Sequence, residues 1–261
     1  MNPSQQVTTN GSKFHAATRQ QFFEHPVPVA TNYYSPVSNL ELYNHIGEQL
    51  NSAGYAIRDE RFVTAYKGQV GLAILDVQDG SNDDLGISRS IAFMNSYNKM
   101  RSVKIAAGAT VRVCSNGMFF GDMGSFSRRH KGKVWEDIKR FTDEQIEQLD
   151  VQLRKARSMK IHTQAMKVNY NHVSTFMGDA VLKDLLTPHM VADFKDSIHT
   201  NKDFAMQFDN GRIESIEGSV WQLYNNATEA LKRSNASDWV SRHANVTNWF
   251  LEECELQDLV V

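Results

Sequence analysis

The apolar residues of this chain follow two different spacings, and one gives way to the other near Val134. Between residues 57 and 114, runs of β-branched and aromatic residues have the length and alternation of strands. From Val134 onward, apolar residues recur every three or four positions, which is the spacing of one helix face. Strands gathered in one half and helices in the other do not form alternating βαβ units. The pattern therefore predicts an α+β fold, with an antiparallel sheet in the N-terminal half and a helical C-terminal half.

Three regions are expected along the 261 residues. Residues 1–35 are polar and interrupted by prolines, which predicts an extended or mobile N-terminal arm outside the core. Residues 36–133 should form a helix from Asn39, closed by Gly54, and then the antiparallel sheet region with a basic loop. Residues 134–261 should form the helical region, where Thr142 and Gln145 have the spacing of a capping box and predict a new helix start. Strands are expected at 57–66, 70–77, 87–95, 101–106 and 110–114, and further helices at 181–194, 220–231 and 240–251.

Composition excludes several classes of protein. The two cysteines, Cys114 and Cys254, are 140 residues apart and form no CxxC pair, so neither a disulfide framework nor a structural zinc site is expected. No apolar run approaches the length of a membrane span, and we expect a cytoplasmic protein without a membrane partner. Phosphate-loop, dinucleotide-binding, zincin and hydrolase-elbow motifs are all missing, and the nine histidines are scattered. We therefore expect no catalytic residues, no metal and no cofactor.

Charge is distributed unevenly, although the net charge is only −2. Residues 99–140 contain ten Lys or Arg against three Asp or Glu, whereas the last 86 residues contain seven against fourteen. A basic centre beside an acidic end favours contact with nucleic acid.

The basic loop that ends at Lys133 places four cations and a histidine within six residues. An anion such as phosphate would offset their repulsion, and nearby aromatic rings would stack on bases, as in single-strand binding proteins. The expected nucleic-acid-binding residues are Lys104, Arg112, Phe119, Phe120, Arg128, Arg129, His130, Lys131 and Lys133. Two alternatives stay open: Lys104 and Arg112 as ordinary charges on a solvated sheet face, and the two phenylalanines as core.

A later segment places Trp221, Asn225 and Thr228 on one helical stripe, with Glu229 beside it. Polar groups on a stripe next to a core need partners if they are buried. We expect them to hold the helix against the rest of the protein, with direct ligand contact as the alternative.

Several of these residues belong to a wider pattern of short motifs in a fixed order. The motifs are Asn95-Ser96-Tyr97-Asn98, then 112–118 with Asn116-Gly117, then His130-Lys131-Gly132, then 224–229 with Asn225, Thr228 and Glu229. Together they resemble the phage- and plasmid-borne family labelled domain of unknown function 932, over about residues 39–250. The chain departs from the family text where Tyr97-Asn98-Lys99 stands in place of His-Asp-Gly, and where Ser115 stands in place of Gln.

The resemblance implies an accessory protein of a mobile element in a bacterial host. We therefore expect a non-enzymatic oligomer that binds single-stranded DNA, in preference to RNA, during recombination or replication. The first alternative is a counter-defence protein that binds a host defence protein or a nucleotide signal. The second is an enzyme acting on nucleic acid, with His130 as general acid or base and Asn95 and Asn116 orienting the substrate.

Overall fold

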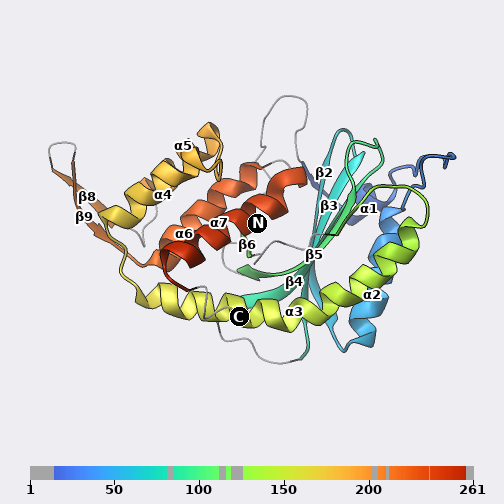
Figure 1. The fold of residues 1–261 in the computed structure, drawn as a ribbon, viewed down its shortest axis with the longest axis horizontal. Helices are drawn as coiled ribbons and strands as arrows, with labels where there is room; N and C mark the ends of the chain where they lie inside the picture. Colours follow the sequence, from blue (N-terminus) through green and yellow to red (C-terminus); the bar gives the residue numbers. More distant parts are fainter. Residues whose placement is uncertain are drawn as a thin grey trace.

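The computed structural model describes residues 15–80, 85–111, 116–118, 126–200, 205–209, 212–234 and 236–256. The expected α+β fold is confirmed (Figure 1). Its centre is a seven-stranded antiparallel sheet in the order β1-β2-β3-β4-β5-β6, with β7 also paired to β5. The strands are β1 (His15–Ala17), β2 (Ala56–Ala65), β3 (Val70–Gln78), β4 (Ile87–Ser96), β5 (Val103–Val111), β6 (Asn116–Met118) and β7 (Phe126–Arg128).

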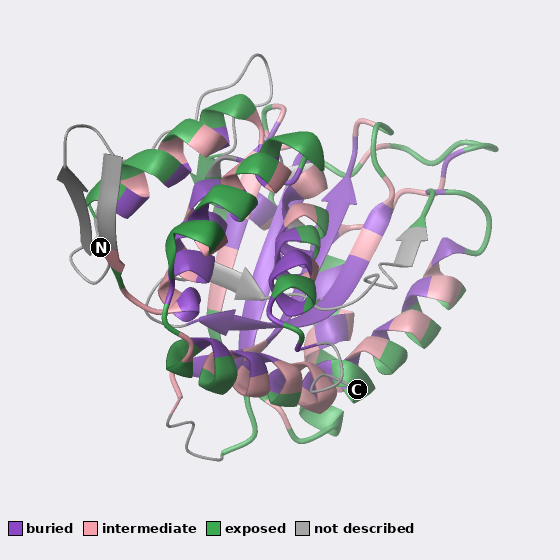
Figure 2. Cartoon of the chain, turned by 60° about the vertical axis from the view of Figure 1, so that its left-hand side comes forward, coloured by how far each residue is buried: buried purple, intermediate pink, exposed green. Residues whose placement is uncertain are grey.

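Period-two alternation gives the sheet two apolar faces, because successive side chains of a strand point to opposite sides. Ile91, Phe93, Val103 and Ile105 lie on one face, where helices α2 (Asn39–Ser52) and α3 (Val134–Ala165) cover them. Ala92, Met94 and Ala106 alternate with these on the opposite face, which packs against α7 (Ala236–Glu253). The sheet therefore lies between helices, and its strands β3, β4 and β5 are buried over most of their length (Figure 2).

The remaining helices, together with part of α7, form a third apolar cluster beside the sheet. They are α4 (Tyr170–Leu182), α5 (Pro188–Thr200), α6 (Val220–Ala230) and the 3-10 turn η1 (Leu231–Arg233). Phe176, Phe194, Tyr224 and Phe250 are buried there together with Leu153 of α3 and Ile87 of β4. Helix α3 thus contributes both to this cluster and to the one that it covers on the sheet, and the sheet region and helical region share apolar contacts.

Some boundaries differ from those expected. The capping-box residues Thr142 and Gln145 do not start a helix, because α3 is one continuous helix of 32 residues. The Thr142 hydroxyl donates to the carbonyl of Ile138, 2.9 Å away in the preceding turn, and the Gln145 side chain accepts from the backbone N–H of Ala107 in β5 at 2.8 Å. Both side chains therefore form hydrogen bonds from the middle of α3 and do not cap a helix.

Three further expectations were wrong. The helix expected over 181–194 is divided between α4 and α5, because Pro188 starts a new helix and disfavours helical backbone before it. The strands expected at 101–106 and 110–114 are joined in β5, which runs without a break to Val111. A hairpin of β8 (Ala205–Asp209) and β9 (Arg212–Glu217) interrupts a region expected to be helical.

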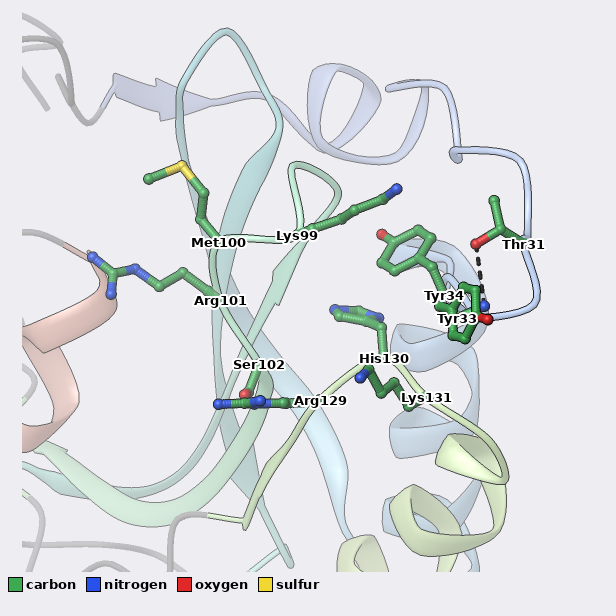
Figure 3. A pocket seen from close by; sticks show the side chains of 10 residues that line it. All are labelled: Thr31, Tyr33, Tyr34, Lys99, Met100, Arg101, Ser102, Arg129, His130 and Lys131. Carbon is green, nitrogen blue, oxygen red and sulfur yellow. Dashed lines mark hydrogen bonds between the residues drawn. The ribbon is translucent and has the colours of Figure 1, made fainter.

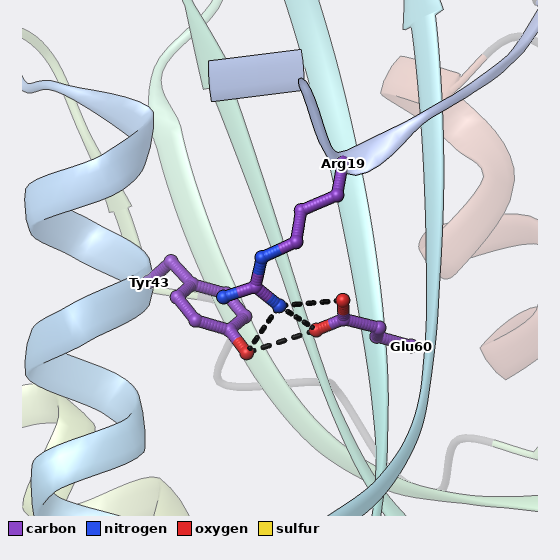
Figure 4. A network of polar contacts seen from close by, with 3 residues as sticks. All are labelled: Arg19, Tyr43 and Glu60. Carbon is purple, nitrogen blue, oxygen red and sulfur yellow. Dashed lines mark hydrogen bonds and ion pairs between the residues drawn. The ribbon is translucent and has the colours of Figure 1, made fainter. Parts of the chain in front are cut away.

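The expectation that residues 1–35 contribute nothing to the core was also wrong for the described part. A short helix, α1 (Arg19–Phe23), follows β1, and its Phe22 is only 1% exposed within the cluster under α2. Gly71 of β3 makes room for it, since a Cβ there would lie 2.6 Å from Cε2 of Phe22. Arg19 also bonds to Glu60 of β2 at 2.5 Å and to the hydroxyl of Tyr43 in α2 at 3.1 Å (Figure 4). Apolar and polar contacts together fix this segment to the sheet.

Among the described helices, none combines the length and apolar character needed to cross a membrane.

Candidate nucleic-acid interface

Three segments that are distant in the sequence meet around a pocket of about 580 Å³ (Figure 3). The first is the chain before α2, at Thr31, Tyr33 and Tyr34, and the second is the loop of residues 99–102 between β4 and β5. The third is the end of the basic loop, which contributes Arg129, His130 and Lys131. The pocket therefore depends on tertiary structure and not on one local motif.

The pocket is strongly basic. Lys99, Arg101, Arg129 and Lys131 line it, all four are exposed, and no carboxylate is among the lining residues. Within the described ranges, none of the four forms an ion pair with Asp or Glu. Their positive charge is consequently available to an anionic ligand.

Two tyrosines accompany these cations. Tyr33 is 81% exposed, whereas Tyr34 is 5% exposed, with its hydroxyl 3.4 Å from the carbonyl oxygen of Ser96. The Lys99 ammonium lies 4.8 Å from the centre of the Tyr34 ring, within the range of a cation–π contact. Aromatic rings beside cations are what a single-strand platform requires.

His130 is the most unusual member of the site. It is 4% exposed, its ring centre lies 5.3 Å from that of Tyr34, and its carbonyl accepts from the Ser35 N–H at 2.9 Å. Neither ring nitrogen has a hydrogen-bond partner among the described residues. Burial lowers the pKa of His130, an effect that the backbone of Ser35 near the ring partly opposes. The side chain is therefore neutral at pH 7, with one ring N–H to donate and one nitrogen to accept.

The motif that begins at Asn95 supports the second pocket segment from behind. The buried Asn95 side chain donates to the carbonyl of Val37 at 2.6 Å and to the side chain of Asn39 at 2.8 Å. The Ser96 hydroxyl donates to the side chain of Asn98, which also accepts from the backbone N–H of Met100. These bonds hold the loop against the start of α2, so the polar residues of the motif position the pocket without lining it.

Lys99 stands at the tip of this loop with a φ of 63°, in the left-handed region that favours glycine. Glycine is the residue usual there in the family that the sequence resembles. The chain therefore places a cation at a backbone position where a side chain is strained.

The remaining predicted cations lie apart from the pocket. Arg128 is ion-paired with Asp137 at 2.7 Å, and Lys133 with Glu136 at 3.1 Å, both at the start of α3. Lys104 is half-buried in β5, on the sheet face that packs against α7, and does not line the pocket. The sheet face that carries Lys104 is therefore covered by a helix, and is not the solvated face that was one alternative from the sequence. Arg112, Phe119 and Phe120 fall outside the described residues.

The late motif residues lie in α6, away from the pocket. Trp221 is buried in the helical cluster and its ring stacks on that of Tyr224, 5.4 Å away. The Asn225 side chain donates to the Trp221 carbonyl, and the Thr228 hydroxyl to the Tyr224 carbonyl. Glu229 is ion-paired with Lys232.

The two remaining motif segments lie nearer the pocket in the sequence. The backbones of Asn116 and Gly117 pair with β5. Gly132, with a φ of 60°, follows the pocket residue Lys131.

The sequence thus indicated Arg129, His130 and Lys131, but not the residues opposite them. Lys99 and Arg101 belong to the basic stretch, but Lys99 looks like an ordinary turn residue and Arg101 was expected to begin a strand. Tyr33 and Tyr34 lie in a segment expected to be an arm. An adjacent pair of tyrosines in an otherwise polar segment was the one available signal.

The fold and the site define an α+β protein with a basic, tyrosine-lined pocket at one end of its sheet. The chain belongs to the family described as Domain of unknown function (DUF932), whose profile matches residues 29–249. The matched range includes all three segments of the pocket. Neither the search of curated proteins nor that of solved structures finds a match.

Proposed function

We propose that the protein is a phage- or plasmid-encoded accessory protein that binds single-stranded DNA in recombination or replication. The observation that carries the proposal is the convergence of Lys99, Arg101, Arg129 and Lys131 beside two tyrosines. Cations without carboxylate partners attract phosphates, and a ring as exposed as that of Tyr33 offers a face to an unpaired base. The proposed role requires no catalysis.

Salt dependence is the direct test. Fluorescence anisotropy with an internally labelled 30-nucleotide single strand would measure Kd at 50 and 200 mM salt. Affinity should fall by up to about 50-fold between these concentrations, the limit reached if all four cations neutralise phosphate charge. Binding that is absent or insensitive to salt would contradict the proposal. An RNA of the same sequence tests the expected preference for DNA.

The basic loop offers a matched pair of double variants. Arg129→Ala/Lys131→Ala removes two cations that line the pocket, and it should lower both the affinity and its salt dependence. Arg128→Ala/Lys133→Ala removes the same charge from the same loop, but these side chains are paired with Asp137 and Glu136. The second variant should change Kd less than about threefold. Equal losses in the two variants would exclude the pocket as the binding site.

Assembly into a homo-oligomer through the helical region is part of the proposal. It is supported by large apolar side chains exposed on α3 and α4, namely Ile161, Tyr170, Val181 and Leu182. Light scattering on the purified protein, compared with the variant Val181→Lys/Leu182→Lys, would measure its mass. A monomer at micromolar concentration would remove this part of the proposal.

A counter-defence protein that binds a nucleotide signal is the second candidate. The pocket volume favours it, since 580 Å³ lies within the range of sites that take one small ligand. Isothermal titration with free nucleotides, in parallel with single strands, distinguishes it from the first candidate. Tight binding of a free nucleotide without binding of a strand would favour this second function.

A further inference from the structure

The pocket has more positive charge than one internal phosphate of a strand requires. A phosphodiester carries one negative charge, whereas a terminal phosphomonoester carries about −1.5 to −2 at pH 7 and offers three strong acceptor oxygens. Lys99, Arg101, Arg129 and Lys131 line a space of about 580 Å³, which suits one nucleotide and not a run of several. The charge and the volume of the pocket together favour the end of a nucleic-acid strand over its middle as the ligand.

His130 adds an observation that does not depend on the cations. A buried imidazole whose two nitrogens lack partners is destabilising, and native proteins rarely retain one without a reason. Its position is nonetheless fixed, because its backbone is bonded to Ser35 and its ring lies against Tyr34 (Figure 3). A ligand oxygen that accepts from this ring would satisfy the group. Phosphate is the ligand chemistry that fits an N–H donor in a pocket lined by cations.

The tyrosines indicate where the rest of the nucleic-acid strand would lie. Tyr34 is buried and held near the carbonyl groups of Ser96 and Tyr97, so it forms part of the wall. Tyr33, its neighbour, is exposed at the rim, where the base of the terminal nucleotide could stack on it.

We propose that this pocket recognises the terminal phosphomonoester of a single-stranded nucleic acid, with His130 donating a hydrogen bond to a phosphate oxygen. The proposal rests on the single-strand binding function and names the part of the strand that the pocket takes. Lys99, Arg101, Arg129 and Lys131 supply the charge, and Tyr33 receives the adjoining base.

The test compares three oligonucleotides of one sequence, each labelled internally: one with a 5′-phosphate, one with a 3′-phosphate and one with hydroxyl groups at both ends. At a fixed salt concentration, one phosphorylated form should bind about tenfold more tightly than the hydroxyl form, the gain expected of an added charge-assisted hydrogen bond. The identity of that form assigns the polarity of the strand in the pocket.

Variants tie this preference to the pocket. His130→Asn should reduce the preference for the phosphorylated end to less than about threefold. Lys131→Ala, which changes an exposed side chain and spares the core, should reduce it as well, so the test does not depend on His130→Asn folding normally. Lys133→Ala is the control, because Lys133 lies two residues after Lys131 and is paired with Glu136. This variant should prefer the phosphorylated end as strongly as the wild type does.

The failures of the two proposals are distinguishable. Equal, salt-dependent binding of all three strands would overturn the terminal-phosphate proposal and leave single-strand binding intact. A preference that persists in both His130→Asn and Lys131→Ala would also overturn it. Absence of binding by every strand would overturn both proposals.

Discussion

The ring of His130 lies 5.3 Å from that of Tyr34, and the contact joins the basic loop to a segment almost a hundred residues earlier in the chain. The backbone of the same two segments is joined by the hydrogen bond from Ser35 to the carbonyl of His130. The wall of the pocket is therefore built by packing, and we expect the ring of Tyr34 to contribute more to the stability of the protein than its hydroxyl does.

Variants of Tyr34 separate these two contributions. Tyr34→Phe should lower the free energy of unfolding by less than about 1 kcal/mol, because the hydroxyl lies a long 3.4 Å and 3.5 Å from its two carbonyl partners. Tyr34→Ala should cost about 3 kcal/mol, because it removes a buried ring. Urea denaturation measures both values, and an equal cost for the two variants would contradict this account.

The buried imidazole of His130 makes stability depend on pH. Burial lowers its pKa in the folded state, so the unfolded chain, with a pKa of about 6.5, binds more protons as the pH falls. The contribution of His130 is therefore present above pH 6.5 and is lost progressively below it. The groups around the ring, Lys99, Arg101, Arg129, Lys131 and the two tyrosines, include no carboxylate that would stabilise the imidazolium.

The measurement is the free energy of unfolding of the wild type and of His130→Asn between pH 5 and 7.5. His25 and His45 also have pKa values lowered by burial, so the wild type retains a slope from these residues. The slope should be shallower in the variant. Identical slopes would mean that His130 is already paired or charged in the folded protein.

Lys99→Gly should separate binding from stability. Glycine relieves the strain of the left-handed backbone at Lys99, which costs about 1 kcal/mol, but it adds entropy to the unfolded chain by a similar amount. The free energy of unfolding should therefore change by less than about 1 kcal/mol, while single-strand affinity falls roughly tenfold with the loss of one phosphate contact.

Lys67→Gly is the matched control for this prediction. Lys67 is also exposed and has a φ of 58°, but it lies in the β2–β3 turn and does not line the pocket. Stability should respond as it does to Lys99→Gly, whereas affinity should stay within about twofold of the wild type. A comparable loss of affinity in both variants would indicate that lysine charge acts without regard to position.

Gly71→Ala should displace Phe22 from its place in the core. The new Cβ would lie 2.6 Å from Cε2 of Phe22, so the ring or the strand must move, at a cost of about 1–3 kcal/mol. Gly47→Ala is a suitable control, since its nearest neighbour is Cδ1 of Ile57 at 3.9 Å and alanine favours the helix by about 1 kcal/mol. Denaturation should show opposite signs for the two variants. A neutral Gly71→Ala would show that α1 contributes little to the core.

Local patterns in the sequence predicted most of the sheet and α2. The strands at 56–65, 70–78 and 87–96 agree with those expected to within a residue or two, because alternation and turn residues are local signals. Gly54, expected to close the first helix, has a φ of 85° directly after its last turn. The β8–β9 hairpin also had a local signal, the Asn210-Gly211 pair, which was overlooked.

The errors arose where tertiary contacts override local patterns. Thr142 and Gln145 have the spacing of a helix start, but Gln145 is used by the backbone of β5, a partner invisible in the sequence. The pocket could be predicted only in part for the same reason. Arg129 and Lys131 were evident from their charge, whereas the role of Lys99 and Tyr34 depends on a chain fold that brings residues 31–34, 99–102 and 129–131 together.

The continuous helix α3 has a mechanical consequence. At 1.5 Å per residue, its 32 residues make a rod about 48 Å long, with Ile138 packed among the strands and Met159 among the later helices. Because one continuous helix packs in both regions, we expect the sheet region and the helical region to unfold together. Heat or denaturant should therefore melt the protein in a single transition, and damage to either end should be felt at the other.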